Sequence, residues 1–209
     1  MTTDQALFPK LVEKQRGLMP EGFRYEEDII NEAEEAVLAK SLATLDLKPF
    51  EFHGHLGNRR VTSFGLRYDY ARRAVKVTDG FPPFVAGLRN KVAKFAGRKV
   101  DEFRQGGVNE YPPGAGIGWH RDKPQFGVIV GVSLLAPATM RLRRAEGTGW
   151  LRASQRLEPR SIYILEGEAR TGWEHSVPPV DTLRYSLTFR TVAEGFRVNA
   201  EKLSLEKFG

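Results

Sequence analysis

The second half of the chain consists of short β-rich runs, and few folds can accommodate so many of them. Between residues 105 and 192 these runs are separated by glycine, proline and charged turns, as strands in a compact β domain are. They read GGVNEY, FGVIVGVSLL, TMRLRR, GWLRAS, RSIYIL and LRYSLTFRTV. Several short strands in succession predict an all-β sandwich or barrel as the core.

The first hundred residues predict two helices. Residues 28–45 carry apolar side chains at near-helical spacing, with acids in the early turns and Asp28 as the expected cap. Residues 82–96 open on two prolines, carry one apolar stripe and are followed by Gly97. Helices followed by many short strands indicate the α+β class.

Between the two helices, aromatic and polar side chains alternate, which predicts β-hairpins. The chain has no evident linker, and 209 residues suit one domain. We therefore expect a single domain over residues 1–209. Its parts would be a helical N-terminal extension at 1–48, a hairpin region at 49–80 and a β core at 105–192.

Basic charge is unevenly distributed along the chain. The net charge is +6 and the pI is about 9.6. Residues 1–51 hold six Lys/Arg and eleven Asp/Glu, whereas residues 52–104 hold twelve and four, and residues 141–160 hold six and two. Segregated basic charge fits a polyanionic partner such as nucleic acid, and it fits a solvated basic surface equally well.

Composition also excludes some classes of protein. No apolar run approaches the roughly 20 residues of a membrane-spanning helix, and the first ten residues lack the pattern of a signal peptide. Without cysteine there are no disulfides and no thiolate metal ligands. We expect a cytoplasmic monomer that makes no membrane contact.

His120 and Asp122 form a His-X-Asp pair within the stretch WHRDKP. Alternate residues of an extended segment point the same way, so both side chains can bind one ion. A non-haem Fe(II) site of the 2-His-1-carboxylate kind needs one more histidine and leaves metal positions open. Taken alone, however, the pair is better explained as part of a polar loop.

The second histidine must be His53, His55 or His175. His175 follows Asp122 by 53 residues, which leaves room for the intervening strands of a jelly roll. His53 and His55 share one face of FHGHLGN, and we expect them to have a polar-surface or substrate-facing role. His175 is therefore the expected third ligand.

Arg184 and Arg190 lie six residues apart in LRYSLTFR, so a strand would place them on one face with Ser186 between them. Two arginines facing a barrel interior would need anionic partners. A small molecule with a carboxylate at each end would supply both, because arginine binds carboxylates bidentately. For this strand considered alone, a solvated face is the better explanation.

In chain order, these elements resemble the AlkB family of Fe(II)/2-oxoglutarate dioxygenases, which includes bacterial-type alkylation-repair proteins. The family pattern is Asn-X-Tyr, His-X-Asp, a distal histidine and Arg-X5-Arg. Here it reads NEY (109–111), HRD (120–122), His175 and RYSLTFR (184–190). The stretch EPRSIYILEGEARTGWEHSV also looks like the strand-turn-His segment of the family. The likeness covers about residues 106–192 and extends more loosely back to residue 50.

The resemblance implies a double-stranded β-helix, or jelly roll, with N-terminal helices and a β-hairpin substrate lid. It implies that His120, Asp122 and His175 bind Fe(II), and that 2-oxoglutarate and O2 are cosubstrates. The implied reaction is oxidative dealkylation of N-alkylated bases in DNA or RNA, which releases succinate, CO2 and an aldehyde. The implied partner is single- or double-stranded nucleic acid.

The resemblance also implies a pocket for 2-oxoglutarate. Arg184, helped by Tyr111, would hold the distal carboxylate. Arg190, helped by Asn109, would lie near the carboxylate that chelates iron. Ser186, where family members often have asparagine, would complete the pocket.

A substrate lid is expected in residues 50–73, where aromatic residues and arginines interleave. An R-X5-6-G-X2-Y arrangement there resembles the lid of relatives that act on nucleic acid and flip a base into the pocket. An ordinary amphipathic hairpin is the alternative. The expected substrate-binding residues are Phe52, Arg59, Arg60, Phe64, Arg67, Tyr68 and Trp119.

In TMRLRR, Met140 and Leu142 should face one way and Arg141 and Arg143 the other. The arginines would form either a surface for a nucleic-acid strand or the charged protection of an exposed edge. Both interpretations explain the pattern equally well.

Several repair members of the family carry a second acid just after His-X-Asp, where it can accept a hydrogen bond from an adenine or cytosine amino group. Lys123 and Pro124 follow here. Hydroxylation of a tRNA base, or the same oxygenase chemistry on a protein or small molecule, therefore stay open as alternatives. The intact ligand pattern argues against a catalytically silent nucleic-acid binder.

Overall fold

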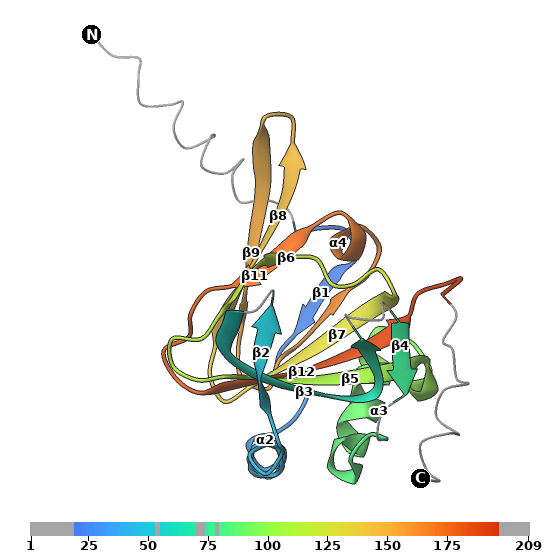
Figure 1. Ribbon diagram of the computed structural model, residues 1–209, viewed down its shortest axis with the longest axis vertical. Coiled ribbons are helices and arrows are strands. Elements are labelled where there is room, and N and C mark those ends of the chain that lie inside the picture. The colour runs from blue at the N-terminus through green and yellow to red at the C-terminus, as the bar shows by residue number, and fades with distance from the viewer. Residues whose placement is uncertain (1–18, 53–54, 70–73, 78–79, 197–209) are drawn as a thin grey trace.

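The computed structural model describes residues 19–52, 55–69, 74–77 and 80–196, and two antiparallel sheets dominate this part of the chain (Figure 1). The large sheet runs, in spatial order, β1 (Phe23–Glu26), β10 (Ile162–Leu165), β7 (Phe126–Leu134), β12 (Arg184–Val192), β5 (Phe103–Tyr111), β3 (His55–Asp69) and β2 (Lys48–Phe52), and β4 (Ala74–Val77) pairs with β3. The small sheet runs β6 (Ile117–His120), β11 (Glu174–Val177), β8 (Ala138–Glu146) and β9 (Gly149–Leu157).

The two sheets form the jelly-roll core that the sequence predicts, in an α+β fold. The six predicted runs are the strands β5, β7, β8, β9, β10 and β12. Three further strands, β1, β6 and β11, have only four residues each. The sequence did not predict these three as strands because so short a segment shows little alternation; β10 also has four residues, but its continuous apolar run IYIL was recognised.

The alternation along β12 divides the interior in two. Leu187 and Phe189, each 2% exposed, point into the largest apolar cluster, where they pack with Leu88 and Val92 of helix α3 (Ala86–Ala96). Helix α2 (Glu32–Leu42) adds Leu42 to the same cluster. Burying each such side chain contributes about 1.5–3 kcal/mol. The large sheet is therefore sealed by helices on one face, and its other face meets the small sheet.

Two smaller apolar clusters lie where the sheets face each other. One joins Met140 and Leu142 of β8 to Ile129 of β7 and Tyr163 of β10. Met140 and Leu142 thus face the core, as their alternation predicts. The other cluster joins Tyr111, Ala115, Ala138, Val177 and Val180.

The second predicted helix is confirmed. It consists of the 3-10 turn η1 (Pro83–Val85) followed by α3, and Gly97 ends it in the left-handed conformation with φ of 65°. A second 3-10 turn, η2 (Val100–Glu102), leads into β5. The short helix α4 (Gly167–Thr171) precedes β11.

The first predicted helix forms, but its expected cap is wrong. Asn31, not Asp28, caps α2: its side chain accepts from the backbone N–H of Glu34, and the Glu34 carboxylate accepts from the backbone N–H of Asn31. This reciprocal pair satisfies two N–H groups that a single cap at residue 28 would leave free. Asp28 has a φ of 51° and instead accepts a hydrogen bond from Arg160.

The segments expected to be an extension and a hairpin also contribute strands to the large sheet. Within 1–48, β1 pairs with β10 at the sheet edge. Within 49–80, β3 pairs with β5 from Arg60 to Gly65. Residues 1–18 lie outside the described residues. None of the helices in the described part of the chain is long and apolar enough to span a membrane.

Gly131 of β7 lies against the buried ring of Tyr163 in the neighbouring strand. A Cβ at this position would lie 2.2 Å from the nearest ring atom. We expect Gly131→Ala to lower the free energy of unfolding by about 1–3 kcal/mol through overpacking. Urea denaturation followed by circular dichroism measures this change.

Gly149→Ala is the matched control for this prediction, because the nearest atom to a Cβ there is 3.8 Å away. If the two variants proved equally stable, the close packing of Gly131 and Tyr163 would be contradicted.

Candidate metal centre

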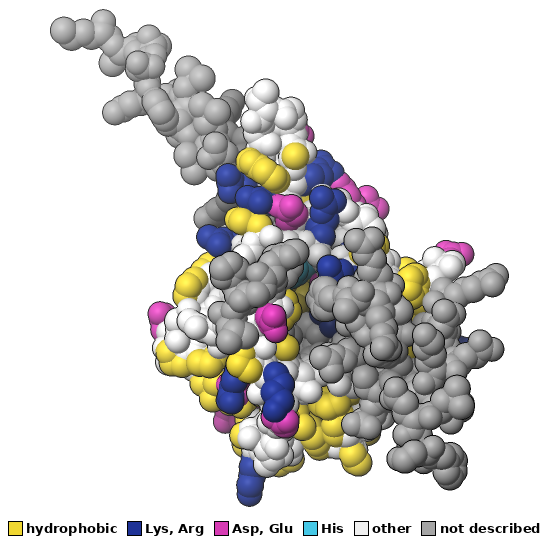
Figure 2. Space-filling model, viewed as in Figure 1, with side chains coloured by type: hydrophobic (Ala, Val, Ile, Leu, Met, Phe, Trp, Pro, Cys, Tyr) yellow, Lys and Arg dark blue, Asp and Glu magenta, His cyan; other side chains and the backbone are white. Residues whose placement is uncertain are grey.

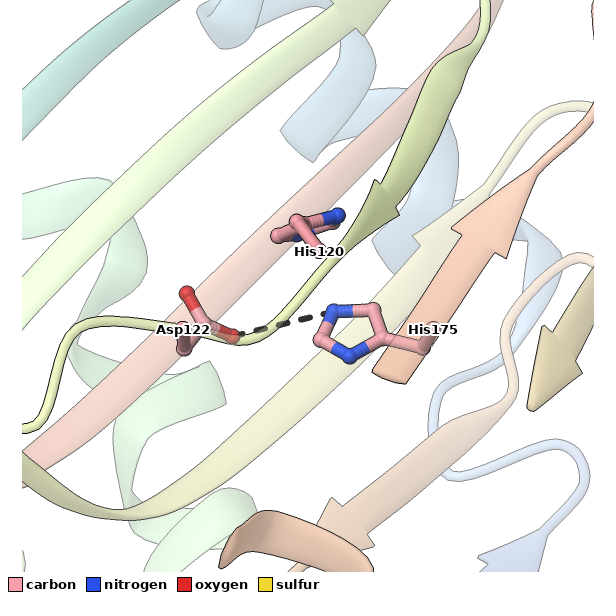
Figure 3. Close-up of side chains that lie close together, drawn as sticks. All are labelled: His120, Asp122 and His175. Atoms are coloured by element: carbon pink, nitrogen blue, oxygen red, sulfur yellow. Dashed lines mark ion pairs between the residues drawn. The ribbon is translucent and has the colours of Figure 1, made fainter. Parts of the chain in front are cut away.

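Two histidines and one aspartate form a compact cluster beside the small sheet. His120 ends β6 and lies opposite His175 of β11 in the antiparallel register. Their ring centroids are 4.2 Å apart. In Figure 3 both rings and the carboxylate of Asp122, from the loop after β6, point toward one another. One ligand atom from each residue lies within 4.8 Å of the others.

The electrostatic environment holds Asp122 and His175 in the form that binds metal. Burial favours the neutral form of Asp122, but the charges of Arg190, His175 and His120 outweigh it, so the pKa of Asp122 lies well below its usual range. Burial, together with the neighbouring His120, lowers the pKa of His175 to about 4, although Asp122 opposes this. At neutral pH the carboxylate is therefore ionised and the His175 imidazole is neutral, as metal ligation requires.

Hydrogen bonds orient the ligand atoms. The carbonyl oxygen of Gly118 lies 2.9 Å from Nδ1 of His120. Because a carbonyl only accepts, this contact favours the tautomer that keeps the Nε2 lone pair free. Oδ2 of Asp122 lies 3.8 Å from Nε2 of His175. Two imidazoles and one carboxylate are the donor set of the 2-His-1-carboxylate sites that bind Fe(II).

Arg170 of α4 holds the loop that carries Asp122. Its buried guanidinium donates from Nη2 to the carbonyls of Lys123, at 2.6 Å, and Phe126, at 2.8 Å. Its Nε donates to the carbonyl of Gly127 at 3.1 Å. One charged group thus fixes three backbone carbonyls directly after Asp122.

Arg184 is buried between the sheets with few partners. It is 1% exposed, its Nε donates to Oγ of Ser133 at 3.0 Å, and its guanidinium lies 5.0 Å from the ring centroid of Tyr111. Within the described part of the chain, its Nη1 has no hydrogen-bond partner. Because an uncompensated buried guanidinium is costly, this position fits an anionic ligand.

Arg190 connects the metal cluster to the same interior. Its Nη2 donates to Oδ1 of Asp122 at 3.2 Å, and its Nη1 donates to Gln105 at 2.7 Å and to Thr188 at 2.8 Å. Its Nε is buried and finds no partner among the described residues. Ser186 lies between the two arginines and is 4% exposed. The shared face that the sequence predicts is therefore the interior face of β12.

Asn109 and Tyr111 both lie on β5, but only Tyr111 lies next to the arginine that was expected to be its partner. Tyr111 is the register partner of Arg184, so the two expected partners lie together. Asn109 lies opposite Ser186, and its Oδ1 accepts from Nη1 of Arg59 at 3.0 Å. Arg190 lies opposite Gln105 instead. The expected pairing of Asn109 with Arg190 is thus not present among the described contacts.

Among the expected lid residues whose side chains the structure describes, Arg59 contacts residues of the expected cosubstrate site. It is 9% exposed, and its guanidinium lies 4.4 Å from the ring centroid of Phe50 and 5.9 Å from that of Tyr111. Arg59 therefore lies beside Asn109 and Tyr111, two residues expected to help bind 2-oxoglutarate.

Arg60 and Phe64 lie on the other face of β3 from Arg59, so their expected contact with the substrate stays a prediction. Arg60 pairs with Glu110, with 2.6 Å between Nε and Oε1, and Phe64 packs against Phe81 in the helix-covered core. Alternate residues of a strand point to opposite faces, so one hairpin strand cannot present neighbouring residues to the same pocket.

Trp119 is also directed away from the metal cluster. It precedes His120 in β6, so its side chain lies on the outer face of the small sheet, where Arg143 stacks 4.3 Å from its ring centroid. His53 lies outside the described residues. So do the side chains of Phe52, His55, Arg67 and Tyr68, although their backbones belong to β2 and β3.

Sequence reasoning missed Ser133, Gln105 and Arg170. Ser133 and Gln105 reach the arginines only through the pairing of β12 with β7 and β5, and pairing is not visible in a single sequence. Arg170 lies five residues before His175 in the EGEARTGWEHSV stretch, so its place near a ligand was a usable signal.

Replacing Arg170 with glutamine should weaken divalent-metal binding. Glutamine cannot bond all three loop carbonyls, and losing a group that orients a metal ligand typically costs about 10–100-fold in affinity. Titration with Mn(II), with the free ion followed by electron paramagnetic resonance, measures the affinity.

Arg156→Gln is the control for Arg170, because Arg156 is exposed and pairs with Glu158 away from the cluster. Circular dichroism checks that both variants are folded. Unchanged Mn(II) affinity in folded Arg170→Gln would show that the loop needs no such support.

Comparison with known proteins agrees with this donor set. A model of the 2OG-Fe(II) oxygenase superfamily matches residues 18–191. The chain is 30% identical over 183 residues to the tRNA (carboxymethyluridine(34)-5-O)-methyltransferase ALKBH8 of Mus musculus, covering 82% of this chain and 27% of that protein. It is 30% identical over 178 residues to the Alkylated DNA repair protein ALKBH8 homolog of Arabidopsis thaliana, covering 72% of this chain and 49% of that protein. The chain therefore spans less than half the length of either relative.

A solved structure described as "The structure of OsALKBH1" has the same fold. It matches with a TM-score of 0.60 and 16% sequence identity, over 83% of this chain and 98% of that one. The family model covers most of the chain, including the His120, Asp122 and His175 cluster and the two arginines of β12. The chain belongs to the 2OG-Fe(II) oxygenase superfamily, and it is similar in sequence to two ALKBH8 proteins and in fold to an ALKBH1 protein.

Proposed function

We propose that this protein uses Fe(II), 2-oxoglutarate and O2 to dealkylate N-alkylated bases in nucleic acid. One observation carries the oxygenase part of the proposal. Buried Arg184 and part-buried Arg190 lie on one interior face of β12, each has a donor without a partner among the described residues, and Arg190 also contacts Asp122 of the metal cluster. A dicarboxylate that also binds the metal would satisfy all of these groups.

His120, Asp122 and His175 would hold Fe(II) through two imidazole nitrogens and one carboxylate oxygen. Once bound, the iron would, together with 2-oxoglutarate and O2, supply the oxidising chemistry that acts on a carbon attached to a base nitrogen. Three protein ligands leave metal positions open for the cosubstrates.

The arginines would orient 2-oxoglutarate. Arg184 would bind the distal carboxylate, because it is the more deeply buried and lies over Tyr111. Arg190 contacts Asp122 and would therefore lie on the metal side. Its positive charge also offsets the carboxylate of Asp122 inside a site from which water is largely excluded.

Three observations support a nucleic-acid substrate. The names of the two similar ALKBH8 proteins refer to tRNA and to alkylated DNA. Residues 52–104, which include β3 and β4, are strongly basic. Arg59 brings one of these charges next to the ring of Tyr111, which would help bind 2-oxoglutarate. A cation next to aromatic rings suits a flipped base and its phosphate.

A second candidate is hydroxylation of a tRNA base, and the residues after Asp122 favour it. Lys123 and Pro124 offer no carboxylate to accept from an adenine or cytosine amino group. A uracil ring has no exocyclic amino group and needs no such acceptor. The name of the mouse relative refers to a modified uridine in tRNA.

Arg184→Gln should weaken 2-oxoglutarate binding by about 10–100-fold, the factor expected for losing a charged hydrogen bond. The variant should not lose stability when 2-oxoglutarate is absent, because the substitution removes an unpaired buried charge. Thermal melting with and without 2-oxoglutarate, in the presence of Mn(II), measures both effects.

Arg104→Gln is the control for Arg184, since Arg104 is exposed on β5. An undiminished shift in melting temperature with 2-oxoglutarate in Arg184→Gln would remove Arg184 from the pocket.

A panel of modified oligonucleotides tests the substrate. The protein, Fe(II) and 2-oxoglutarate are incubated with DNA or RNA that carries methylated or etheno-adducted bases, or with tRNA that carries modified uridine. The masses of the nucleic acids are then measured by mass spectrometry. Dealkylation predicts loss of the alkyl mass with release of an aldehyde. Hydroxylation predicts the gain of one oxygen without release.

Asp122→Ala is the control for this panel and should abolish turnover, because it removes one of the three metal ligands. Conversion of 2-oxoglutarate to succinate without change in any oligonucleotide would favour a protein or small-molecule substrate. Full turnover by Asp122→Ala would refute the metal assignment.

A further inference from the structure

The outer face of the small sheet carries a cluster of tryptophans and arginines that the proposed reaction does not use. We call it the Trp-Arg face, and it consists of Trp119, Arg141, Arg143, Trp150 and Arg152. Cross-strand pairing places them together: Arg143 lies opposite Arg152, and Trp150 lies opposite Ala145. Figure 2 shows basic side chains beside hydrophobic ones over β8 and β9.

Arg143 is the centre of the Trp-Arg face. Its guanidinium lies 4.3 Å from the ring centroid of Trp119 and 4.1 Å from that of Trp150. Its Nε also donates to Oε2 of Glu174 at 2.7 Å. The two rings are therefore held apart by a planar cation, which fixes their orientation.

The other two arginines are available for a partner. Arg141 is exposed, and its Nε donates to the neutral hydroxyl of Ser176 at 3.2 Å. Arg152 is exposed and has no ion pair or hydrogen bond within the described part of the chain. With one glutamate against three arginines, the face carries an excess of positive charge.

Trp150 distinguishes this face from an edge that is merely protected by charge. β9 is the edge strand of the small sheet, and arginines alone would deter pairing with another strand. Protection does not require a tryptophan that is 44% exposed. An oriented aromatic ring beside cations that have no carboxylate partner among the described residues is instead the arrangement that binds single-stranded nucleic acid, through base stacking and phosphate contacts.

The Trp-Arg face begins beside the metal cluster. Trp119 directly precedes His120 in β6, and Glu174 directly precedes His175 in β11. These two histidines are register partners. A strand whose base enters the metal site would therefore pass close to this face with its neighbouring nucleotides.

We propose that the Trp-Arg face binds a single-stranded segment flanking the target base, with a base stacked on Trp150 and phosphates on Arg141 and Arg152. This inference rests on the proposed action on nucleic acid. An acidic peptide would satisfy the arginines, but it would leave the exposed ring of Trp150 without a flat partner.

The double variant Arg141→Ala/Arg152→Ala tests the phosphate contacts. Fluorescence anisotropy with a labelled twelve-nucleotide single strand is measured over a range of salt concentrations. We expect affinity to fall about tenfold at low salt, and the salt slope to fall by about 0.7 for each lost contact. The double variant Lys40→Ala/Lys94→Ala removes the same charge from helices α2 and α3 and should bind like the wild type.

Trp150→Ala tests the stacking contact. We expect affinity to fall about tenfold with an unchanged salt slope, because a neutral side chain is lost. The oligonucleotide should also quench tryptophan fluorescence of the wild type more than that of this variant. Uncoupled conversion of 2-oxoglutarate to succinate should be the same in all these proteins, because the substitutions lie outside the pocket.

The outcomes separate this inference from the function on which it rests. If the wild type modifies an oligonucleotide and the Trp-Arg variants bind it as tightly as the lysine control, the proposed role of the Trp-Arg face is refuted. The proposed function is then unaffected. If the wild type neither binds nor modifies any oligonucleotide, both are refuted. Binding of a polyglutamate peptide in place of the oligonucleotide would refute the nucleic-acid partner.

Discussion

The organisation of the molecule depends on the alternation of side chains along β12. One face of this strand carries Leu187 and Phe189 into the helix-covered core, and the other carries Arg184 and Arg190 between the sheets. Burying apolar side chains on one face fixes the register, because a slip by one residue would exchange the two sets. The same burial that stabilises the fold therefore forces two guanidinium groups into the interior, where they require anions.

The metal cluster depends on a second pairing, that of β6 with β11. This short contact sets His120 opposite His175, although 54 residues separate them in the chain. Asp122 lies beyond the end of β6, so the strand does not hold it. Arg170 and Arg190 hold it instead, one through the backbone of the loop and the other through the carboxylate. Both cations also lower the pKa of Asp122 against the effect of burial.

Much of the site was predictable because its residues lie in short patterns. His120 and Asp122 are two residues apart, and the two arginines are six apart on one strand. The sequence did not predict which residues of β3 lie on which face of the strand. Arg59 lies beside Asn109, whereas Arg60 pairs with Glu110 on the other face of the same strand. A basic and aromatic composition indicates the type of partner, but only the strand's orientation decides which residues meet it.

The sequence alone determined the chemical groups of the site, their order along the chain and the strands that carry most of them. It did so because alternation and His-X-Asp spacing are local, and local geometry follows from the backbone. The tertiary structure decided which groups meet. It brought Gln105 and Ser133 to the arginines, set Asn109 against Arg59 and placed Trp119 on the outer face. Those contacts depend on pairing between strands that are distant in the chain. The pairing is fixed by the burial of apolar side chains across the whole sheet, which a single segment of sequence does not show.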